Sequence, residues 1–328
     1  MAPNNKTFYT GIDTWRGLAA FMVCFYHFAL YENNFGILFG PENPIKQIGQ
    51  YGYLGVYIFF VISGFVIPLS MFSGGYTYRK VGKFIAKRSL RIEPPYLATI
   101  ILMFCVQYYF SRLWGLPFTI DPVRILAHMF YVVPFVPGME WYNIIFWTLA
   151  IEFQFYLVCA VLFPLWTHRH RWVRHLSLLF FLLSAWYITD GRFAPFYAAI
   201  FGLGITLFLL RKGFINRFEA VLYIAICALL LFGGNTREIA VGSLCAFGLL
   251  LLPDFRFKPG VALGKVSYSL YLTHGMTGGT FLMMTFRGDS PRDPLLFVSA
   301  LAISVAFASL FYFVVEKPFQ GLSRKMKL

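Results

Sequence analysis

The stretch DTWRGLAAFMVCFYHF, residues 13–28, places an arginine and a histidine in an otherwise apolar pattern. An α-helix turns 100° per residue, so Arg16 and His27 lie on one face, about 16 Å apart along the helix axis. If Arg16 is near a membrane interface, His27 lies near the middle of the bilayer, where ionisable groups normally face a polar cavity. Alternatively, Arg16 extends to the interface and His27 bonds a neighbouring helix. The pair alone leaves both interpretations open.

Two further arginines have the spacing of a phosphate site. Arg88 and Arg91 stand at the end of the most basic loop and are spaced i, i+3, so they point the same way on a helical turn. Two guanidinium groups suit a ligand that carries phosphate. The other basic residues of this loop are typical of a loop that stays in the cytoplasm, and that explanation also applies to Arg88 and Arg91 taken alone.

An acid and a cluster of hydroxyl and imidazole groups follow in two later apolar stretches. Glu152 lies within FWTLAIEFQFYL, where a carboxylate must be protonated, paired or solvated. A structural ion pair to another helix is the alternative. The stretch VSYSLYLTH carries Tyr268, Ser269, Tyr271 and His274, and its i, i+3 spacings give one polar face. Hydrogen bonds between helices would explain the same side chains without any chemistry.

Membrane-spanning helices must position these residues. Of the 328 residues, 59% are hydrophobic and 13% are charged, against about 25% charged residues in a typical soluble domain. Apolar runs long enough to cross a bilayer recur along the whole chain. The predicted fold class is all-α: a polytopic membrane protein with about ten transmembrane helices and a single domain over residues 1–328. The segment 122–139 contains three prolines and is predicted to be interfacial or re-entrant. The expected spans are 12–31, 51–71, 93–111, 141–166, 174–189, 194–210, 217–233, 236–252, 264–285 and 294–315.

The distribution of basic residues predicts the orientation. Twenty of the 28 Lys and Arg residues fall on one side of the expected spans, seven fall on the other, and Arg16 lies within the first span. This bias places both termini in the cytoplasm. Because the net charge of +14 is spread over short loops, no nucleic-acid partner is expected. The five cysteines form no CxxC pair, so neither a disulfide nor a metal site is predicted, and the first span is expected to remain uncleaved.

Six motifs in order give a specific resemblance. IDTWRGLAAFMVCFYH, GVYIFFVISGF, RSLRIEPPY, WTLAIEFQFYL, VSYSLYLTH and VEKPF resemble the membrane acyltransferase 3 family over essentially the whole chain. Members transfer acyl groups, commonly acetyl from acetyl-CoA, to sugar hydroxyls of surface glycans. In length the chain is similar to bacterial O-antigen O-acetyltransferases, including phage-encoded ones. The expectation is that it lacks the soluble esterase-like domain of larger relatives.

The resemblance implies roles for the residues identified above. His27 and Glu152 become catalytic residues, and Arg16, Arg88 and Arg91 become contacts for the acyl donor. Tyr268, Ser269 and His274 are candidates for substrate or oxyanion contacts. Acyl-CoA is a donor substrate, so no permanently bound cofactor and no metal is expected. The implied partners are acyl-CoA, membrane lipids and a lipid-linked or surface glycan such as lipopolysaccharide O-antigen, and the implied location is the bacterial inner membrane.

A physical mechanism fits these roles, with alternatives. The phosphates of cytosolic acyl-CoA would bind the arginines, and the thioester would reach His27, which acts as a general base on an acceptor hydroxyl from the periplasmic side. A transient acyl-histidine is the other route. Glu152 would orient His27 or pair with Arg16. Alternative functions are acylation of a lipid or an antibiotic-like small molecule, and transport or flipping of a glycan without covalent chemistry.

Overall fold

The computed structural model describes residues 5–252, 257–288 and 293–326. These ranges are helical apart from loops and one small hairpin, in which β1 (Glu32–Asn33) pairs with β2 (Gly36–Ile37). A helix, or a run of consecutive helices, stands at each of the ten expected spans. They are α1 (Asn5–Ala29), α3 (Gly55–Ser73), α4 (Val81–Trp114), α6 (Trp147–Trp166), α7 (Arg171–Tyr187), α8 (Ala198–Arg211), α9 (Arg217–Gly234), α10 (Arg237–Leu251), α12 (Ser267–His274) with η6 (Gly275–Gly279) and α13 (Thr280–Thr285), and α14 (Asp293–Phe311) with η7 (Tyr312–Glu316) and α15 (Lys317–Lys325).

The membrane class rests on length and composition. Six helical stretches in the described part of the chain are long and apolar enough to cross a bilayer: Pro44–Ser73, Tyr78–Trp114, Ile144–Trp166, Ala194–Arg211, Arg217–Gly234 and Asp293–Lys325. Others, such as α7 and α10 with 17 and 15 residues, are shorter. The chain is thus an all-α, multi-pass membrane protein, whereas the count of ten spans stays a prediction.

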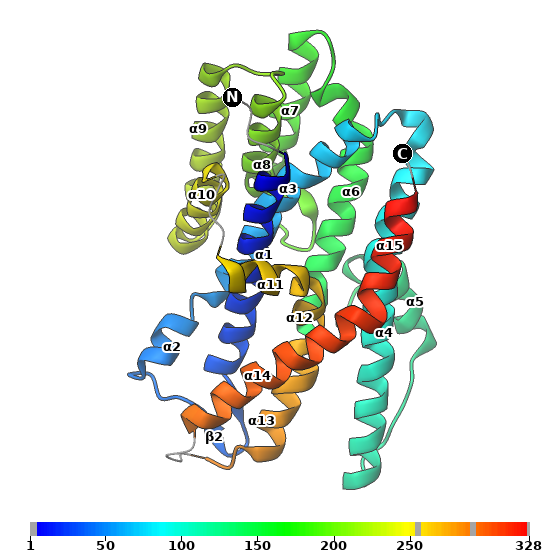
Figure 1. Cartoon of the computed structure of the whole chain (residues 1–328), viewed down its shortest axis with the longest axis vertical. Helices are drawn as coiled ribbons and strands as arrows, with labels where there is room; N and C mark the ends of the chain where they lie inside the picture. Colours follow the sequence, from blue (N-terminus) through cyan, green and yellow to red (C-terminus); the bar gives the residue numbers. More distant parts are fainter. Residues whose placement is uncertain (1–4, 253–256, 289–292, 327–328) are drawn as a thin grey trace.

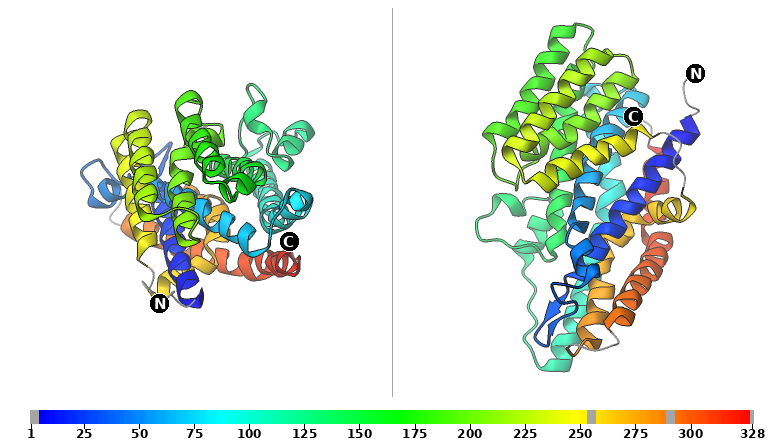
Figure 2. Two further views of the ribbon diagram at one scale, coloured as in Figure 1. Left: turned by 90° about the horizontal axis from the view of Figure 1, so that it is seen from above. Right: turned by 90° about the vertical axis from the view of Figure 1, so that its left-hand side faces the viewer.

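The helices form two flanking groups around a central one. In Figure 1, α9 and α10 lie on one side, α4, α5 (Pro122–Met129) and α15 lie on the other, and α1, α3, α6, α8 and α12 run between them. The start of α1 and the end of α15 lie toward the same end of the molecule as the α6–α7 turn in both side views (Figures 1 and 2). This arrangement fits termini on one side of the membrane; their cytoplasmic location stays a prediction.

Glycines let pairs of helices approach backbone to backbone. A Cβ atom placed on Gly204 of α8 would lie 2.1 Å from the Val61 carbonyl oxygen of α3. The short helix α11 (Lys258–Lys265) crosses α1 in the same way, because a Cβ atom on Gly264 would lie 1.9 Å from the carbonyl oxygen of Asp13. Small residues at such crossings are typical of membrane helix pairs, in which van der Waals packing drives association.

The third span differs from its prediction. Its helix was expected over 93–111, after a basic loop, yet α4 begins at Val81 and continues through Pro94 and Pro95. Proline is tolerated in membrane helices because neighbouring groups can satisfy the carbonyls that it frees, here those of Leu90 and Arg91, four residues before each proline. Arg88 and Arg91 therefore lie within a helix that packs into the protein, and not in a loop.

Candidate active site

A cavity of about 350 Å³ opens between α1, α3, α4, α6, α12 and the η7–α15 end of the chain. It is lined by both polar and apolar side chains. We call it the arginine cavity. It brings together five of the residues that the sequence marked: Arg16, Arg88, Arg91, Glu152 and Tyr268. Its other polar lining residues are Asp13, Ser63, Thr148, Tyr156, Tyr271, Glu316 and Arg324.

Guanidinium groups outnumber carboxyl groups in the arginine cavity. Four arginines face three acids, and the most buried arginine, Arg88, is only 7% exposed. Its Nη2 atom has no hydrogen-bond partner among the described residues, and its guanidinium carbon lies 5.6 Å and 5.5 Å from the ring centroids of Phe84 and Tyr156. Arg16 reaches Asp13 only at 3.9 Å. A buried cation without a close acid is costly unless a ligand supplies the negative charge.

Glu152 makes contacts other than those expected. Its Oε1 atom accepts hydrogen bonds from the Tyr156 hydroxyl at 2.7 Å and the Ser63 hydroxyl at 3.4 Å. Within the described residues, no hydrogen bond or ion pair joins it to His27 or to Arg16, the two partners proposed from sequence. The carboxyl group lines the arginine cavity, where it holds Tyr156 beside Arg88.

His27 pairs with His274, from the opposite end of the sequence. The two side chains meet with Nδ1 of His27 3.2 Å from Nε2 of His274. Nδ1 of His27 also lies 2.8 Å from the Val23 carbonyl oxygen, and Nδ1 of His274 lies 3.1 Å and 2.8 Å from the carbonyl oxygens of Leu270 and Tyr271. Carbonyl oxygens only accept hydrogen bonds, so we assign the hydrogen of each neutral ring to Nδ1. Nε2 of His274 then accepts from His27, and Nε2 of His27 keeps a lone pair.

The histidine pair and the arginine cavity lie at different depths. His27 follows Arg16 by eleven residues on α1, about 16 Å along the axis. His274 comes one turn after the cavity residue Tyr271 on α12, and neither histidine lines the cavity. His27 is half-buried, whereas His274 is 1% exposed. The arrangement separates a basic binding chamber from an imidazole with a free lone pair.

The polar side chains near His274 mostly form hydrogen bonds within the protein. The Tyr268 hydroxyl donates to the Ile92 carbonyl at 2.7 Å. Ser269 does not line the arginine cavity, because its hydroxyl and its backbone N–H both donate to Glu316 Oε2, at 2.5 Å and 3.1 Å. Glu316 is 1% exposed and also accepts from Gln320 Nε2 at 2.5 Å. Glu316 was not predicted as a site residue, although it lies within the VEKPF motif. The sequence feature that could have identified it is a single acid at the end of the last apolar run.

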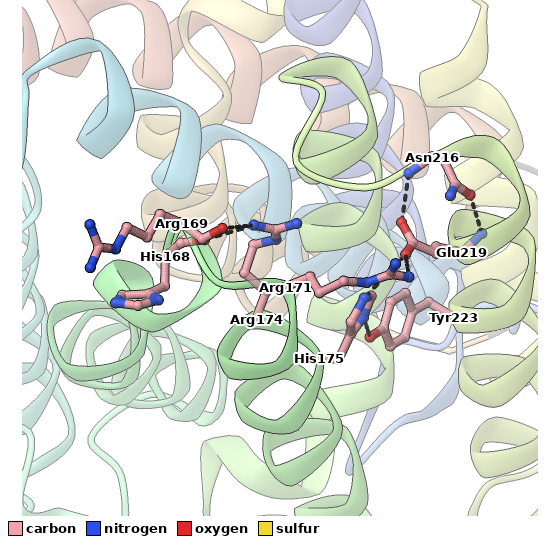
Figure 3. A network of polar contacts seen from close by, with 8 residues as sticks. All are labelled: His168, Arg169, Arg171, Arg174, His175, Asn216, Glu219 and Tyr223. Atoms are coloured by element: carbon pink, nitrogen blue, oxygen red, sulfur yellow. Dashed lines mark hydrogen bonds and ion pairs between the residues drawn. The ribbon is translucent and has the colours of Figure 1, made fainter.

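A second polar network lies on α7 and α9 and includes residues of the basic run His168–His175 (Figure 3). Glu219 Oε1 contacts Arg171 Nη2 at 3.0 Å and His175 Nε2 at 3.1 Å, and His175 Nδ1 lies 2.5 Å from the Tyr223 hydroxyl. Glu219 and Asn216 form a capping box at the start of α9. Glu219 is thus bound by Arg171 and His175, and Arg174 donates through Nη1 to the carbonyls of His168 and Arg169.

Comparisons with known proteins identify the family that the sequence motifs resemble. The profile of one family, described as the acyltransferase domain, matches residues 9–313. The chain belongs to this family. It is similar to the O-acetyltransferase OatA of Staphylococcus aureus, with 25% identity over 279 residues that cover 80% of this chain and 40% of OatA. It is also similar to Nodulation protein 10 of Rhizobium leguminosarum bv. viciae and to the putative acetyltransferase ORF330 of Acidianus two-tailed virus, each at 25% identity.

The extent of these matches differs between relatives. The alignments cover 81% of Nodulation protein 10 and 83% of ORF330, but the chain spans only about two fifths of OatA. No solved structure matches. Among the described residues, no group of three or more His, Cys, Asp or Glu side chains could hold a metal ion. Membership of the family makes this chain an acyltransferase.

Proposed function

We propose that this acyltransferase moves an acetyl group from cytosolic acetyl-CoA to a hydroxyl of a cell-surface glycan, such as the O-antigen of lipopolysaccharide, across the bacterial inner membrane. The observation that carries the proposal is Arg88, a buried guanidinium whose Nη2 has no partner among the described residues, in a cavity with Arg16, Arg91 and Arg324. Guanidinium groups bind phosphate oxygens in paired, charge-assisted hydrogen bonds. Coenzyme A brings several phosphate charges, and a thin arm that can extend the remaining distance to His27.

The proposed reaction uses His27 as the base. Nε2 of His27 takes the proton of the acceptor hydroxyl while the oxygen attacks the thioester carbonyl, forming the new C–O bond. The C–S bond then breaks, and the thiolate of coenzyme A takes the proton back from the imidazolium. A positioned base of this kind contributes about 10²–10⁴-fold to the rate. An acetyl-histidine intermediate would require the same nitrogen as nucleophile.

His274 and Glu152 support this reaction without touching the substrate. We propose that His274 is a positioning residue, since its Nε2 accepts from His27 and leaves the reactive nitrogen unprotonated. Glu152 is assigned to the donor side, because it holds Tyr156 beside Arg88. Tyr268 and Ser269 donate to Ile92 and Glu316, so neither is assigned to the oxyanion.

An acetyl-transfer assay tests the function. The purified protein in liposomes is given radiolabelled acetyl-CoA and four p-nitrophenyl glycosides, the β-D-glucoside, β-D-galactoside, α-L-rhamnoside and N-acetyl-β-D-glucosaminide. Label in a glycoside, lost in the His27→Ala variant, supports the proposal. Label only in phospholipid would assign a lipid acceptor instead. A protein that binds acetyl-CoA and labels neither class would contradict the proposal.

A further inference from the structure

A second cavity, larger than the arginine cavity, lies farther along the same helices. It is an open groove of about 600 Å³. Four segments form it: the later part of α4, the loop into α5, the segment before η4 (Ile144–Phe146), and η6. Its lining residues are Ile100, Met103, Phe104, Val106, Gln107, Thr119, Asp121, Arg124, Tyr142, Asn143, Ile144, Gly275, Met276 and Thr280.

The histidine pair lies between this groove and the arginine cavity. Three separate helical segments line the two spaces in the same order of depth. On α4, Ile92 lines the arginine cavity and Met103 lines the groove, eleven residues or about 16 Å farther on. On the α12–η6 segment, Tyr271 lines the arginine cavity, Gly275 lines the groove, and His274 lies between these two residues in the sequence. The residues around α6 follow the same order, with Glu152 at the cavity and Asn143 at the groove.

The groove is polar but carries no spare charge. The guanidinium of Arg124 donates through Nε to the Glu140 carbonyl at 2.9 Å and through Nη2 to the Trp141 carbonyl at 3.0 Å. Asp121 accepts from the backbone N–H groups of Val123 and Arg124 at 2.9 Å and 3.2 Å, which caps α5. Asp121 and Arg124 are the single acid and the single base of the groove lining, so their formal charges cancel. This contrasts with the four arginines that line the other cavity.

Uncharged hydrogen-bonding groups remain available in the groove. Within the described ranges, the side chains of Gln107 and Thr119 make no hydrogen bond, and Asn143 uses only its Oδ1, which accepts from Ile145 N at 3.2 Å. Amide and hydroxyl groups can both donate and accept, as sugar hydroxyls do. The volume falls within the range of about 300–1,000 Å³ that is usual for small-molecule sites.

A π-helical turn brings the groove next to His274. η6 has the sequence GMTGG and begins directly after His274. Gly275 is exposed, and the nearest atom to a Cβ placed on it is Asn143 Nδ2, at 3.8 Å. The absence of a side chain there keeps the groove open up to the backbone beside the histidine pair. Such π-turns are frequent at functional sites.

We propose that this groove binds the acceptor as an uncharged hexopyranose unit. Gln107 and the free Nδ2 of Asn143 bond its hydroxyls, and the reacting hydroxyl passes Gly275 toward Nε2 of His27. The inference rests on the proposed function and adds to it the acceptor's site and its chemical class. An anionic sugar is disfavoured, because the charge of the one guanidinium in the groove lining is offset by the carboxylate of Asp121 in the same lining.

Three variants test the groove with the glycoside assay described above. Gln107→Ala and Asn143→Asp each remove a donor; the aspartate keeps the oxygen that caps Ile145. Loss of a neutral hydrogen bond corresponds to about a two- to twelvefold rise in the glycoside KM. Gly275→Leu fills the groove and is expected to abolish transfer. In all three, the dissociation constant for coenzyme A should stay within twofold of the wild-type value, since the arginine cavity is untouched.

Two controls make the outcome specific. The first control, Gly279→Leu, alters the same π-turn at a residue that does not line the groove and where no atom lies within 4 Å of the added Cβ. The second control, Gln47→Ala, removes an exposed glutamine on α2 (Pro44–Gly49). Both should transfer normally. An unchanged glycoside KM in Gln107→Ala and Asn143→Asp, with Gly275→Leu no worse than Gly279→Leu, overturns the groove assignment alone. Absence of glycoside labelling by the wild-type protein overturns the proposed function, and the groove assignment with it.

Discussion

The arginine cavity and the α7–α9 network of Figure 3 use the same kinds of side chain with opposite results. Both contain arginines, a glutamate and a tyrosine. In the network, Glu219 meets Arg171 at 3.0 Å and His175 at 3.1 Å, so its charge is balanced within the protein. In the cavity, the ion pair of Arg16 with Asp13 is 3.9 Å long, and Nη2 of the buried Arg88 has no partner among the described residues.

The difference separates structure from binding. Glu219 of the network is bound by Arg171 and His175, and the value of the network is in holding two helices together. The Arg171 side chain is also open to solvent, whereas Arg88 is buried and makes no ion pair among the described residues, so an entering anion would complete its surroundings. For this reason we propose the donor site at the two arginines of RSLR and not at the more conspicuous basic run HRHRWVRH.

The largest effect is expected from His27→Ala. The variant lacks the only nitrogen lone pair that the proposed reaction uses, so transfer should fall by at least about 10²-fold. Coenzyme A should bind with nearly unchanged affinity, because its phosphates are held about 16 Å away. Radiolabel transfer and CoA binding on the purified variant measure the two parts separately. Near-normal transfer by a folded His27→Ala protein would remove the histidine from the chemistry.

The cavity half of the comparison is tested by Arg88→Gln combined with Arg91→Gln. A charge-assisted hydrogen bond is worth about 1.5–3 kcal/mol, so each substitution should raise the KM for acetyl-CoA about tenfold or more. Arg79→Gln with Lys83→Gln is the matched control, since both side chains are exposed on the same basic segment. Lys80 is unsuitable as a control, because its Nζ donates to the carbonyls of Gly74 and Gly75. Equal effects of the two pairs would mean that only general positive charge matters.

A smaller effect is expected from His274→Gln. The variant disturbs the partner of His27 Nδ1, which should lower kcat about tenfold and leave the KM for acetyl-CoA unchanged. The pH profile provides the decisive readout. Wild-type activity should fall about tenfold per unit at pH values well below the pKa of His27, because the protonated ring has no lone pair; the ordinary histidine pKa is about 6.5. A purely structural role for His274 would leave the midpoint of that acid limb where it is, and that result would contradict the positioning role.

The smallest effect belongs to the network. Glu219→Gln should lower the stability by about 1 kcal/mol or less, because the Arg171 side chain is 63% exposed and surface ion pairs contribute little. Transfer rate and acetyl-CoA KM should match those of the wild type. A Tm measurement in detergent beside the transfer assay checks both. A loss of activity that exceeds the loss of folded protein would break the contrast between the two regions.

The spacing of residues along one helix correctly predicted which side chains share a face of that helix. Arg88 and Arg91 share a cavity because an i, i+3 pair faces one way on α4, and Tyr268, from the predicted polar face of VSYSLYLTH, lines the same cavity. Contacts between helices could not be read in this way. Glu152 was expected near His27 or Arg16, yet it bonds Tyr156, a residue one turn away on its own helix. The partner of Ser269 is Glu316, 47 residues later, and no periodicity in the sequence encodes that pairing.

The crossing of α1 by α11 has a consequence for how the protein is made. The helix α1 carries Arg16 and His27, but the backbone that packs against Gly17 belongs to Gly260 and Gly264, which are synthesised much later. The imidazole that meets His27 lies 247 residues downstream. During synthesis, α1 must therefore wait in the membrane with its polar face unpartnered until the last quarter of the chain has been inserted. A chain that stalls before α11 lacks both the backbone that packs against Gly17 and the imidazole that meets His27, however many of its helices have already crossed the bilayer.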